Sequence, residues 1–255
     1  MIRQIFLQEY GNGKLNPEGE SLYRELKQRN YPIKLFTPKQ LYRSRLKLDC
    51  ESLVAGEIPI VLSALKQLKI PFVKISDYPN ALEKFFHRRI WLSSLRKLEA
   101  RLYAGKSQPI FAKPANRSKR FTGRIFDSFH DLWAVSGVSR QEKIWCSEVV
   151  NWLSEYRIYM IKNQNSDSQI VGIYPYNEQQ SETSLKIDLS TVREAVRRLD
   201  KAGESVAGYA LDFGILETGE TALIEMNDGF SLGNYGLSDR FYTDLILARW
   251  EELIG

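Results

Sequence analysis

The chain has 255 residues and a net charge of +5, and its pI of about 9.0 indicates an anionic partner: a nucleotide, a nucleic acid or an acidic peptide. Its composition, 43% hydrophobic and 26% charged, is that of an ordinary globular protein, and its apolar runs are too short to span a membrane. Only two histidines and two cysteines are present, which excludes a zinc site built from them and disfavours a histidine-based catalytic triad. Cys50 and Cys146 lie far apart, and the start of the chain lacks a secretion signal, so we expect a cytoplasmic protein, with a single disulfide as the alternative.

The first third of the chain alternates expected strands with expected helices. Strands are expected at residues 2–7, 33–36 and 53–55, and helices at residues 17–30 and 59–68. This rhythm is typical of a small parallel α/β unit. A long, basic, amphipathic helix is then expected from residue 77 to about residue 103.

From residue 109 onward the pattern changes to antiparallel strands. They are expected at residues 110–113, 124–126, 144–150, 156–161 and 170–174. A helix at residues 189–202, a β-hairpin and a closing helix at residues 239–253 complete the chain. The fold class is therefore α+β, with a small α/β unit ahead of it.

The hairpin near the C-terminus carries the most informative side chains. Its apolar strands at residues 206–216 and 221–227 are joined by a turn containing Gly219. Alternation places Glu225 and Asn227 on one face, and pairing across the hairpin would bring Asp212 close to them. Three such oxygen donors can hold Mg²⁺ together with substrate phosphates. A hairpin with a polar, solvated face is the alternative, and taken alone the hairpin favours neither interpretation.

Two further patterns suit a nucleotide. Lys113 ends a short strand and is followed by a basic loop with one glycine, so a lysine on a rigid strand would neutralise phosphates while the loop closes over them. Downstream, the connector formed by Val149 and Val150 would sandwich an adenine, with Glu148 before it and Glu155 at the start of the next strand reaching ribose hydroxyls. Taken alone, each pattern is better explained as a charged hairpin, and neither common glycine-rich nucleotide motif is present.

Arg157 lies inside a strongly apolar strand. Arginine is seldom buried without a carboxylate or phosphate partner. On one face with Glu155 and Tyr159, it would hold a charged ligand or stabilise charge that develops during group transfer. The alternative is a structural ion pair with Glu155 or Glu225.

The order of these pieces resembles the ATP-grasp superfamily, and most closely the RimK-like, stand-alone domains of bacteria and phages. The residues that carry the resemblance are Lys113, Glu148 or Glu155, Arg157, and the final Asp212, Glu225 and Asn227. The resemblance covers about residues 80–255. It implies an ATP-grasp fold, in which two α+β subdomains sandwich the nucleotide, at residues 76–255, with a lid at about 108–150 and a core at about 151–255. Residues 1–75 would form the pre-ATP-grasp α/β unit.

The resemblance also implies a function. Such proteins use ATP and one or two Mg²⁺ ions to turn a carboxylate into an acylphosphate, which an amine attacks to give an amide. Here Arg157 and Lys113 would be catalytic, and Asp212, Glu225 and Asn227 would bind the metal. The nucleotide would be held by the lysine, the closing loop, the connector and an upstream arginine: Lys113, Ser118, Lys119, Arg120, Gly123, Glu148, Val149, Val150, Glu155 and Arg89. The carboxylate and amine substrates, a peptide or protein among the options, would contact Tyr174, Tyr176, Asn234 and Tyr235.

Two other functions remain open at this point. A kinase would use the same site to make a stable phosphorylated product, and a non-catalytic module would bind nucleotide or nucleic acid. All three metal-ligand positions are filled, which argues against a decayed site. Neither ligated substrate nor the oligomeric state can be inferred from the sequence.

Overall fold

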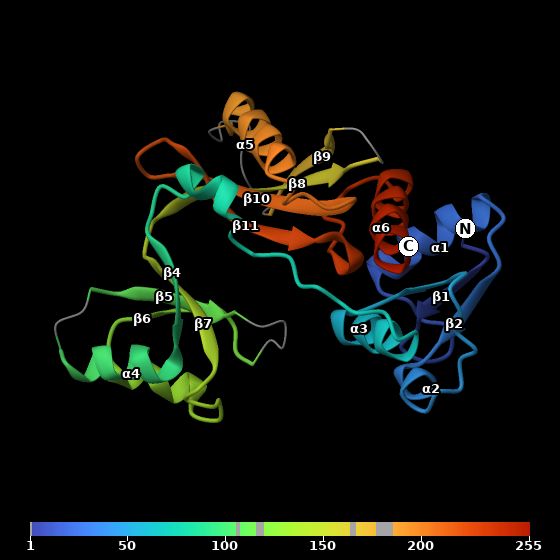
Figure 1. Ribbon diagram of the computed structural model, residues 1–255, viewed down its shortest axis with the longest axis horizontal. Helices are drawn as coiled ribbons and strands as arrows, with labels where there is room; N and C mark the ends of the chain where they lie inside the picture. Colours follow the sequence, from blue (N-terminus) through green and yellow to red (C-terminus); the bar gives the residue numbers. More distant parts are fainter. Residues whose placement is uncertain (1, 106–107, 116–119, 164–166, 177–185) are drawn as a thin grey trace. The chain divides into compact units, whose positions relative to one another are not determined.

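The computed structural model describes residues 2–105, 108–115, 120–163, 167–176 and 186–255 (Figure 1). It divides into two compact units. Unit 1 comprises Met1–Phe85, Ser154–Ile215 and Thr221–Gly255, and unit 2 comprises Phe86–Leu153 and Leu216–Glu220. The N-terminal segment thus belongs to the same compact unit as most of the C-terminal half, and the division at residue 75 inferred from the family resemblance stays a prediction.

Unit 1 begins with the predicted parallel α/β arrangement. Strands β1 (Gln4–Gln8), β2 (Ile33–Phe36) and β3 (Ser52–Ala55) form a parallel sheet in the order β2-β1-β3. Helices α1 (Pro17–Gln28), α2 (Pro38–Tyr42) and α3 (Ile58–Gln67) connect and follow the strands. Because the chain passes first to one side of β1 and then to the other, the carboxyl ends of β1 and β3 form a topological switch point.

The last helix of the chain, α6 (Asp239–Ile254), packs against α1, and Figure 1 shows the two side by side. Arg24 and Arg29 of α1 pair with Asp239 and Asp244 of α6 at 2.7 and 2.6 Å. Buried Trp250 donates its indole N–H to the backbone oxygen of Ser52 at 2.9 Å. These contacts give the N-terminal sheet and the C-terminal helix one continuous hydrophobic core.

The second sheet of unit 1 carries the predicted hairpin. Strands β8 (Trp152–Ile161), β9 (Gln169–Pro175), β10 (Gly208–Leu216) and β11 (Thr221–Asp228) lie in the order β11-β10-β8-β9. Helix α5 (Leu189–Lys201) buries Val192, Ala195, Val196 and Leu199, a spacing that places all four on one helical face. Two 3₁₀ turns, η1 (Asn80–Phe85) and η3 (Gly229–Ser231), also belong to this unit.

Unit 2 contains an antiparallel sheet of β4 (Ile90–Ser94), β5 (Ile110–Pro114), β6 (Arg124–Phe126) and β7 (Lys143–Glu148), in the order β4-β7-β5-β6. Helix α4 (Leu95–Tyr103) and the 3₁₀ turn η2 (Phe129–Val135) cover one of its faces. The buried residues between them include Leu98, Ala112 and Cys146. Within the described part of the chain, no helix is long and apolar enough to cross a bilayer.

The prediction of one long helix from residue 77 to residue 103 is wrong. The structure places η1, then β4, then α4 in this stretch. His87 has a φ of +48°, which breaks any helix, and the apolar run that follows pairs with β7. The side chain of Ser94 then accepts a hydrogen bond from the N–H of Lys97, so a new helix begins after it.

Candidate functional site

The hairpin brings its three polar residues together. Asp212 of β10 lies opposite Glu225 of β11, and a bulge follows Asp212. The side-chain nitrogen of Asn227 donates to Asp212 Oδ2 at 2.7 Å and to Glu225 Oε1 at 3.2 Å. The turn has Gly219 at a φ of +92°, a conformation that glycine adopts without strain. The expected proximity of the three side chains is therefore present.

Arg157 of the neighbouring strand β8 forms a buried ion pair with Asp212. Its Nε donates to Asp212 Oδ1 at 2.9 Å, and its Nη2 donates to Oδ2 at 2.8 Å. Arg157 is 7% exposed and Asp212 only 2%. Burial alone would lower the pKa of Arg157, but its hydrogen bonds to Asp212 and the charge of that carboxylate raise it above the usual range. The sequence analysis considered Glu155 and Glu225 as ion-pair partners and missed Asp212, which holds the guanidinium from two sides.

Two tyrosines enclose this ion pair. The Tyr176 hydroxyl donates to Asp212 Oδ2 at 2.8 Å and accepts a hydrogen bond from Arg157. The rings of Tyr176 and Tyr235 lie 5.1 and 5.0 Å from the Arg157 guanidinium carbon, which is cation–π geometry. Tyr235 holds a φ of +40°, a strained backbone conformation for a non-glycine residue. Of the four residues proposed for substrates, these two therefore belong to the charged cluster.

The other two residues proposed for substrates are placed differently. Tyr174 packs edge-to-face on buried Tyr159, with the ring centroids 6.2 Å apart, and borders the hydrophobic core. The backbone oxygen of Asn234 accepts the N–H of Leu237 at 2.7 Å, in the loop after η3. Neither contact ties these residues to the charged cluster.

Glu155 lies inside β8 and not ahead of it, because β8 begins at Trp152. Its backbone oxygen accepts the N–H of Tyr176, which extends the pairing with β9. Burial raises the pKa of Glu155, and the nearby carboxylates of Asp212 and Glu225 raise it further. Glu155 thus lies close enough to the two hairpin carboxylates to feel their charge, a juxtaposition that the sequence did not reveal.

In unit 2, Lys113 lies on the sheet face opposite α4. Strand β5 buries Ile110 and Ala112 under α4 and η2, so alternation turns Phe111 and Lys113 to the other side. Lys113 lies opposite Trp145 in the sheet. Gly123 lies against the same face, because a Cβ on it would approach the Phe111 ring to 2.7 Å. Arg120, near that glycine, is exposed, whereas Ser118 and Lys119 lie outside the described residues.

The connector after β7 borders a pocket within unit 2. Val149, Val150 and Asn151 line a cavity of 440 Å³ together with His87 and the hairpin turn that contains Glu217. The N–H of Glu217 donates to the Asn151 backbone oxygen at 3.0 Å, which ties turn and connector together. Sequence reasoning found the connector but missed His87 and the turn, because only the folded chain brings them to it.

Glu148 and Arg89 contact each other. A carboxylate oxygen of Glu148 accepts the backbone N–H of Arg89 at 2.9 Å, and the N–H of Glu148 donates to the Arg89 backbone oxygen at 3.1 Å. The Arg89 guanidinium lies over the Trp91 ring, 4.9 Å from its centroid. Glu148 is therefore engaged in holding the start of β4, beside the connector but outside the pocket lining.

Comparison with known families decides the relationship. The profile of a family described as an ATP-grasp domain, family 2 of its clade, matches residues 85–245, more than half of the chain. The chain belongs to this ATP-grasp family. The resemblance inferred from the sequence is thereby confirmed at the level of the superfamily. A search of curated proteins finds no match.

Solved structures with the same fold extend over nearly the whole of this ATP-grasp chain. N5-carboxyaminoimidazole ribonucleotide synthetase from Thermotoga maritima is 15% identical, with a TM-score of 0.60, over 97% of this chain and 76% of its own. D-alanyl-alanine synthetase A from Vibrio cholerae is 13% identical, with a TM-score of 0.57, over 98% of both chains. A RimK-domain ATP-grasp protein from Sphaerobacter thermophilus is 13% identical, with a TM-score of 0.56, over 96% of this chain and 99% of its own. At these identities the similarity shows the ATP-grasp fold.

The donor set of the ATP-grasp hairpin fits magnesium better than other metals. Among the residues that the structure describes, no cluster of three or more histidine, cysteine, aspartate or glutamate side chains could hold a metal ion. Mg²⁺ does not need such a cage, because it is commonly bound by one or two carboxylates with waters and substrate phosphates. Glu225, Asp212 and the Asn227 amide provide two carboxylates and one amide group at one point of the sheet.

Proposed function

We propose that the chain is an ATP-dependent carboxylate–amine ligase that works through an acylphosphate and releases ADP and phosphate. The observation that carries this proposal is the cluster on β8, β10 and β11, where Asp212, Glu225 and Asn227 lie beside a buried, permanently charged arginine. Phosphoryl transfer to a carboxylate needs positioned positive charge and no protein nucleophile. Membership of the ATP-grasp family and the ligases among proteins of the same fold support this reaction class.

The metal would be held by Asp212, Glu225 and Asn227. Asp212 Oδ2 already accepts hydrogen bonds from Arg157, Tyr176 and Asn227, so its first task in the protein alone is to order these three groups. Glu225 and Asn227 are less buried than Asp212 and are the better-placed direct ligands. When bound, Mg²⁺ would neutralise phosphate charge during the transfer.

The nucleotide would be bound by groups of unit 2. Lys113 stands on a sheet face that also carries Phe111 and Trp145, so a cation lies beside apolar rings. The pocket bordered by Val149 and Val150 would take the adenine, with backbone groups of the connector available for its edge. Arg120, Gly123 and Arg89 would flank the phosphates, and Ser118 and Lys119 would complete the closing loop. Glu155 stays a proposed ribose contact, and the carboxylates near it give it a second possible role at the metal.

The proposed chemistry has two steps. A carboxylate oxygen of the first substrate attacks the γ-phosphorus of ATP, the bond to the bridging oxygen breaks, and ADP leaves. The amine nitrogen, having lost a proton, then attacks the acyl carbon, and phosphate leaves with the electron pair of the broken C–O bond. Arg157 would stabilise the negative charge of both transition states, and Asp212 and the two tyrosines hold it in place before any substrate binds.

A magnesium-dependent ATP turnover assay against amino acids and peptides tests the proposal. We expect ADP and phosphate, with an acylphosphate that hydroxylamine traps as a hydroxamate. AMP and pyrophosphate would contradict acylphosphate chemistry, and a stable phosphorylated product without any amide would identify a kinase. Turnover absent under all conditions, with salt-sensitive nucleic-acid binding that needs neither ATP nor magnesium, would favour a binding module.

A further inference from the structure

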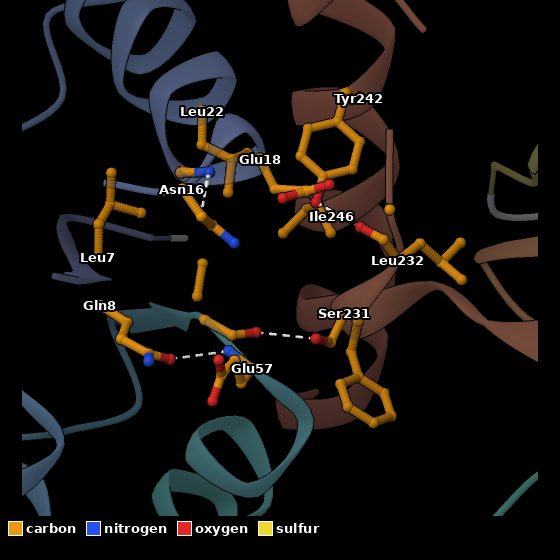
Figure 2. A pocket seen from close by; sticks show the side chains of 15 residues that line it. Leu7, Gln8, Asn16, Glu18, Leu22, Glu57, Ser231, Leu232, Tyr242 and Ile246 are labelled. Atoms are coloured by element: carbon orange, nitrogen blue, oxygen red, sulfur yellow. Dashed lines mark hydrogen bonds between the residues drawn. The ribbon is translucent and has the colours of Figure 1, made fainter. Parts of the chain in front are cut away.

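A cavity of 160 Å³ lies in unit 1, at the carboxyl ends of β1 and β3 (Figure 2). It is bounded by the starts of α1 and α3 on one side and by η3 and α6 on the other. Because β1 is flanked by β2 and β3, the cavity lies at the switch point of the parallel sheet, where open α/β sheets bind ligands. Its size is that of a benzene-sized group, which is too small for a nucleotide.

The walls of this cavity are held by specific contacts. The Gln8 side-chain oxygen accepts the N–H of Glu57 at 2.8 Å, and the Ser231 hydroxyl donates to the Gly56 backbone oxygen at 2.8 Å. Residue 56 must be glycine, because a Cβ there would lie 2.5 Å from the Gln8 oxygen. The strand ends and the η3 segment are therefore fixed around an open space.

The charged groups that line the cavity are all acidic. They are Glu18 and Glu57, and no lysine, arginine or histidine is among the lining residues that the structure describes. The Tyr10 hydroxyl donates to Glu57 at 2.9 Å, whereas Glu18 has no hydrogen-bond or ion-pair partner within the described part of the chain. In a chain with a net charge of +5, an acidic cavity selects for a cation and against phosphate or carboxylate.

Two amide groups supply hydrogen-bond donors to the same space. Gln8 is only 4% exposed, and since its oxygen is used by Glu57, its Nε2 is left without a partner among the described residues. The Asn16 oxygen accepts the N–H of Gly19 at 2.8 Å, so its nitrogen is turned inward, and Figure 2 shows it pointing into the cavity. A buried donor without an acceptor is costly, which favours a ligand that carries an uncharged oxygen.

From this lining we infer that the cavity binds a primary ammonium group on a small, otherwise uncharged residue, with the ammonium at Glu18 and a carbonyl oxygen at the Gln8 and Asn16 amides. Apolar side chains such as Leu22 and Ile246 complete the lining and suit a short aliphatic side chain. Both the amino-terminal residue of a peptide and a free amino-acid amide have this chemistry. The inference rests on the proposed function, in which this group is the amine acceptor.

Calorimetric titration of the full chain without ATP tests the inference. The probes are alaninamide, trialanine amide, N-acetylalaninamide and inorganic phosphate. We expect alaninamide to bind and the acetylated compound and phosphate not to bind. Glu18→Gln should weaken alaninamide binding about tenfold, the effect of about 1.4 kcal/mol. Glu20→Gln, an exposed first-turn acid on the same helix that does not line the cavity, should bind like the wild type.

The comparison of the two ammonium probes identifies the source of the ligand. Trialanine amide binding as tightly as alaninamide assigns the group to a peptide end, and alaninamide alone assigns it to a free compound. No alaninamide binding, equal binding of N-acetylalaninamide, or unchanged binding by Glu18→Gln with native circular dichroism would overturn the inference. Magnesium–ATP titration of the same samples separates this result from the proposed function, which survives if the nucleotide still binds.

Discussion

Replacing Arg157 by methionine should destabilise the protein strongly. The guanidinium is 7% exposed and provides two of the four hydrogen bonds that Asp212 receives from described side chains, and Asp212 itself is 2% exposed. Removing it leaves a buried carboxylate with the Tyr176 and Asn227 donors but without its countercharge. Breaking a buried pair from one side typically costs about 3–5 kcal/mol, or roughly 6–20 °C in Tm at about 2–4 °C per kcal/mol for a chain of this size.

A second variant separates the cost of an unpaired charge from the loss of packing. Arg157→Met combined with Asp212→Leu removes both charges, and an apolar pair is often neutral or better in such sites. We therefore expect the double variant to regain most of the lost free energy of unfolding. Urea-induced unfolding followed by circular dichroism measures it. A loss below about 1 kcal/mol for Arg157→Met, as for a surface pair, or a double variant no more stable than the single one, would refute the reasoning.

Other described residues yield three more predictions. Lys113→Met should weaken ATP binding by about tenfold or more without changing the thermal midpoint, because a charged hydrogen bond to phosphate is lost; calorimetric titration measures it. Thr191 and its neighbour lower the pKa of Asp188, the exposed cap of α5, from 3.8 to about 2, so its stabilising effect is full above pH 4 and lost as the pH falls toward 2. Asp188→Ala should lower the unfolding midpoint at neutral pH and have no effect near pH 2. Burial raises the pKa of Cys146 to about 12 and Cys50 is exposed, so a thiol reagent at pH 8 should label only Cys50 in the native protein; rapid labelling of both would contradict this.

The hairpin was predictable because its information is local. Alternation fixed the face of Glu225 and Asn227, and the Gly219 turn fixed the pairing that sets Asp212 opposite Glu225. Amphipathic spacing likewise predicted α5 and α3 to within a few residues. In these elements the local pattern and the tertiary environment favour the same structure.

The failures arise where distant segments decide the structure. The stretch from residue 77 to residue 103 reads as helical by its basic and apolar spacing, but β4 forms because β7 offers a partner far along the chain. The partner of Arg157 could not be identified for a similar reason. The order β11-β10-β8-β9, which puts Asp212 beside Arg157, is a property of the sheet and not of either strand.

The acidic cavity shows the same limit. Gln8, Asn16 and Glu57 belong to the N-terminal sheet region, whereas Ser231 and Ile246 come from the end of the chain. None of these residues forms a motif along the sequence. Only packing of α6 against α1 brings them to one space, and the N-terminal segment comes to line the cavity through that contact.

The central claim is that the hairpin cluster binds magnesium with ATP, and Glu225→Gln tests it most directly. Calorimetric titration of ATP should be run with magnesium and with EDTA on this variant, the wild type and Glu251→Gln, a matched control on the exposed face of α6. We predict that magnesium strengthens ATP binding to the wild type and to the control, and that Glu225→Gln loses this strengthening while keeping its native circular dichroism. Magnesium-dependent affinity that is unchanged in Glu225→Gln would contradict the account.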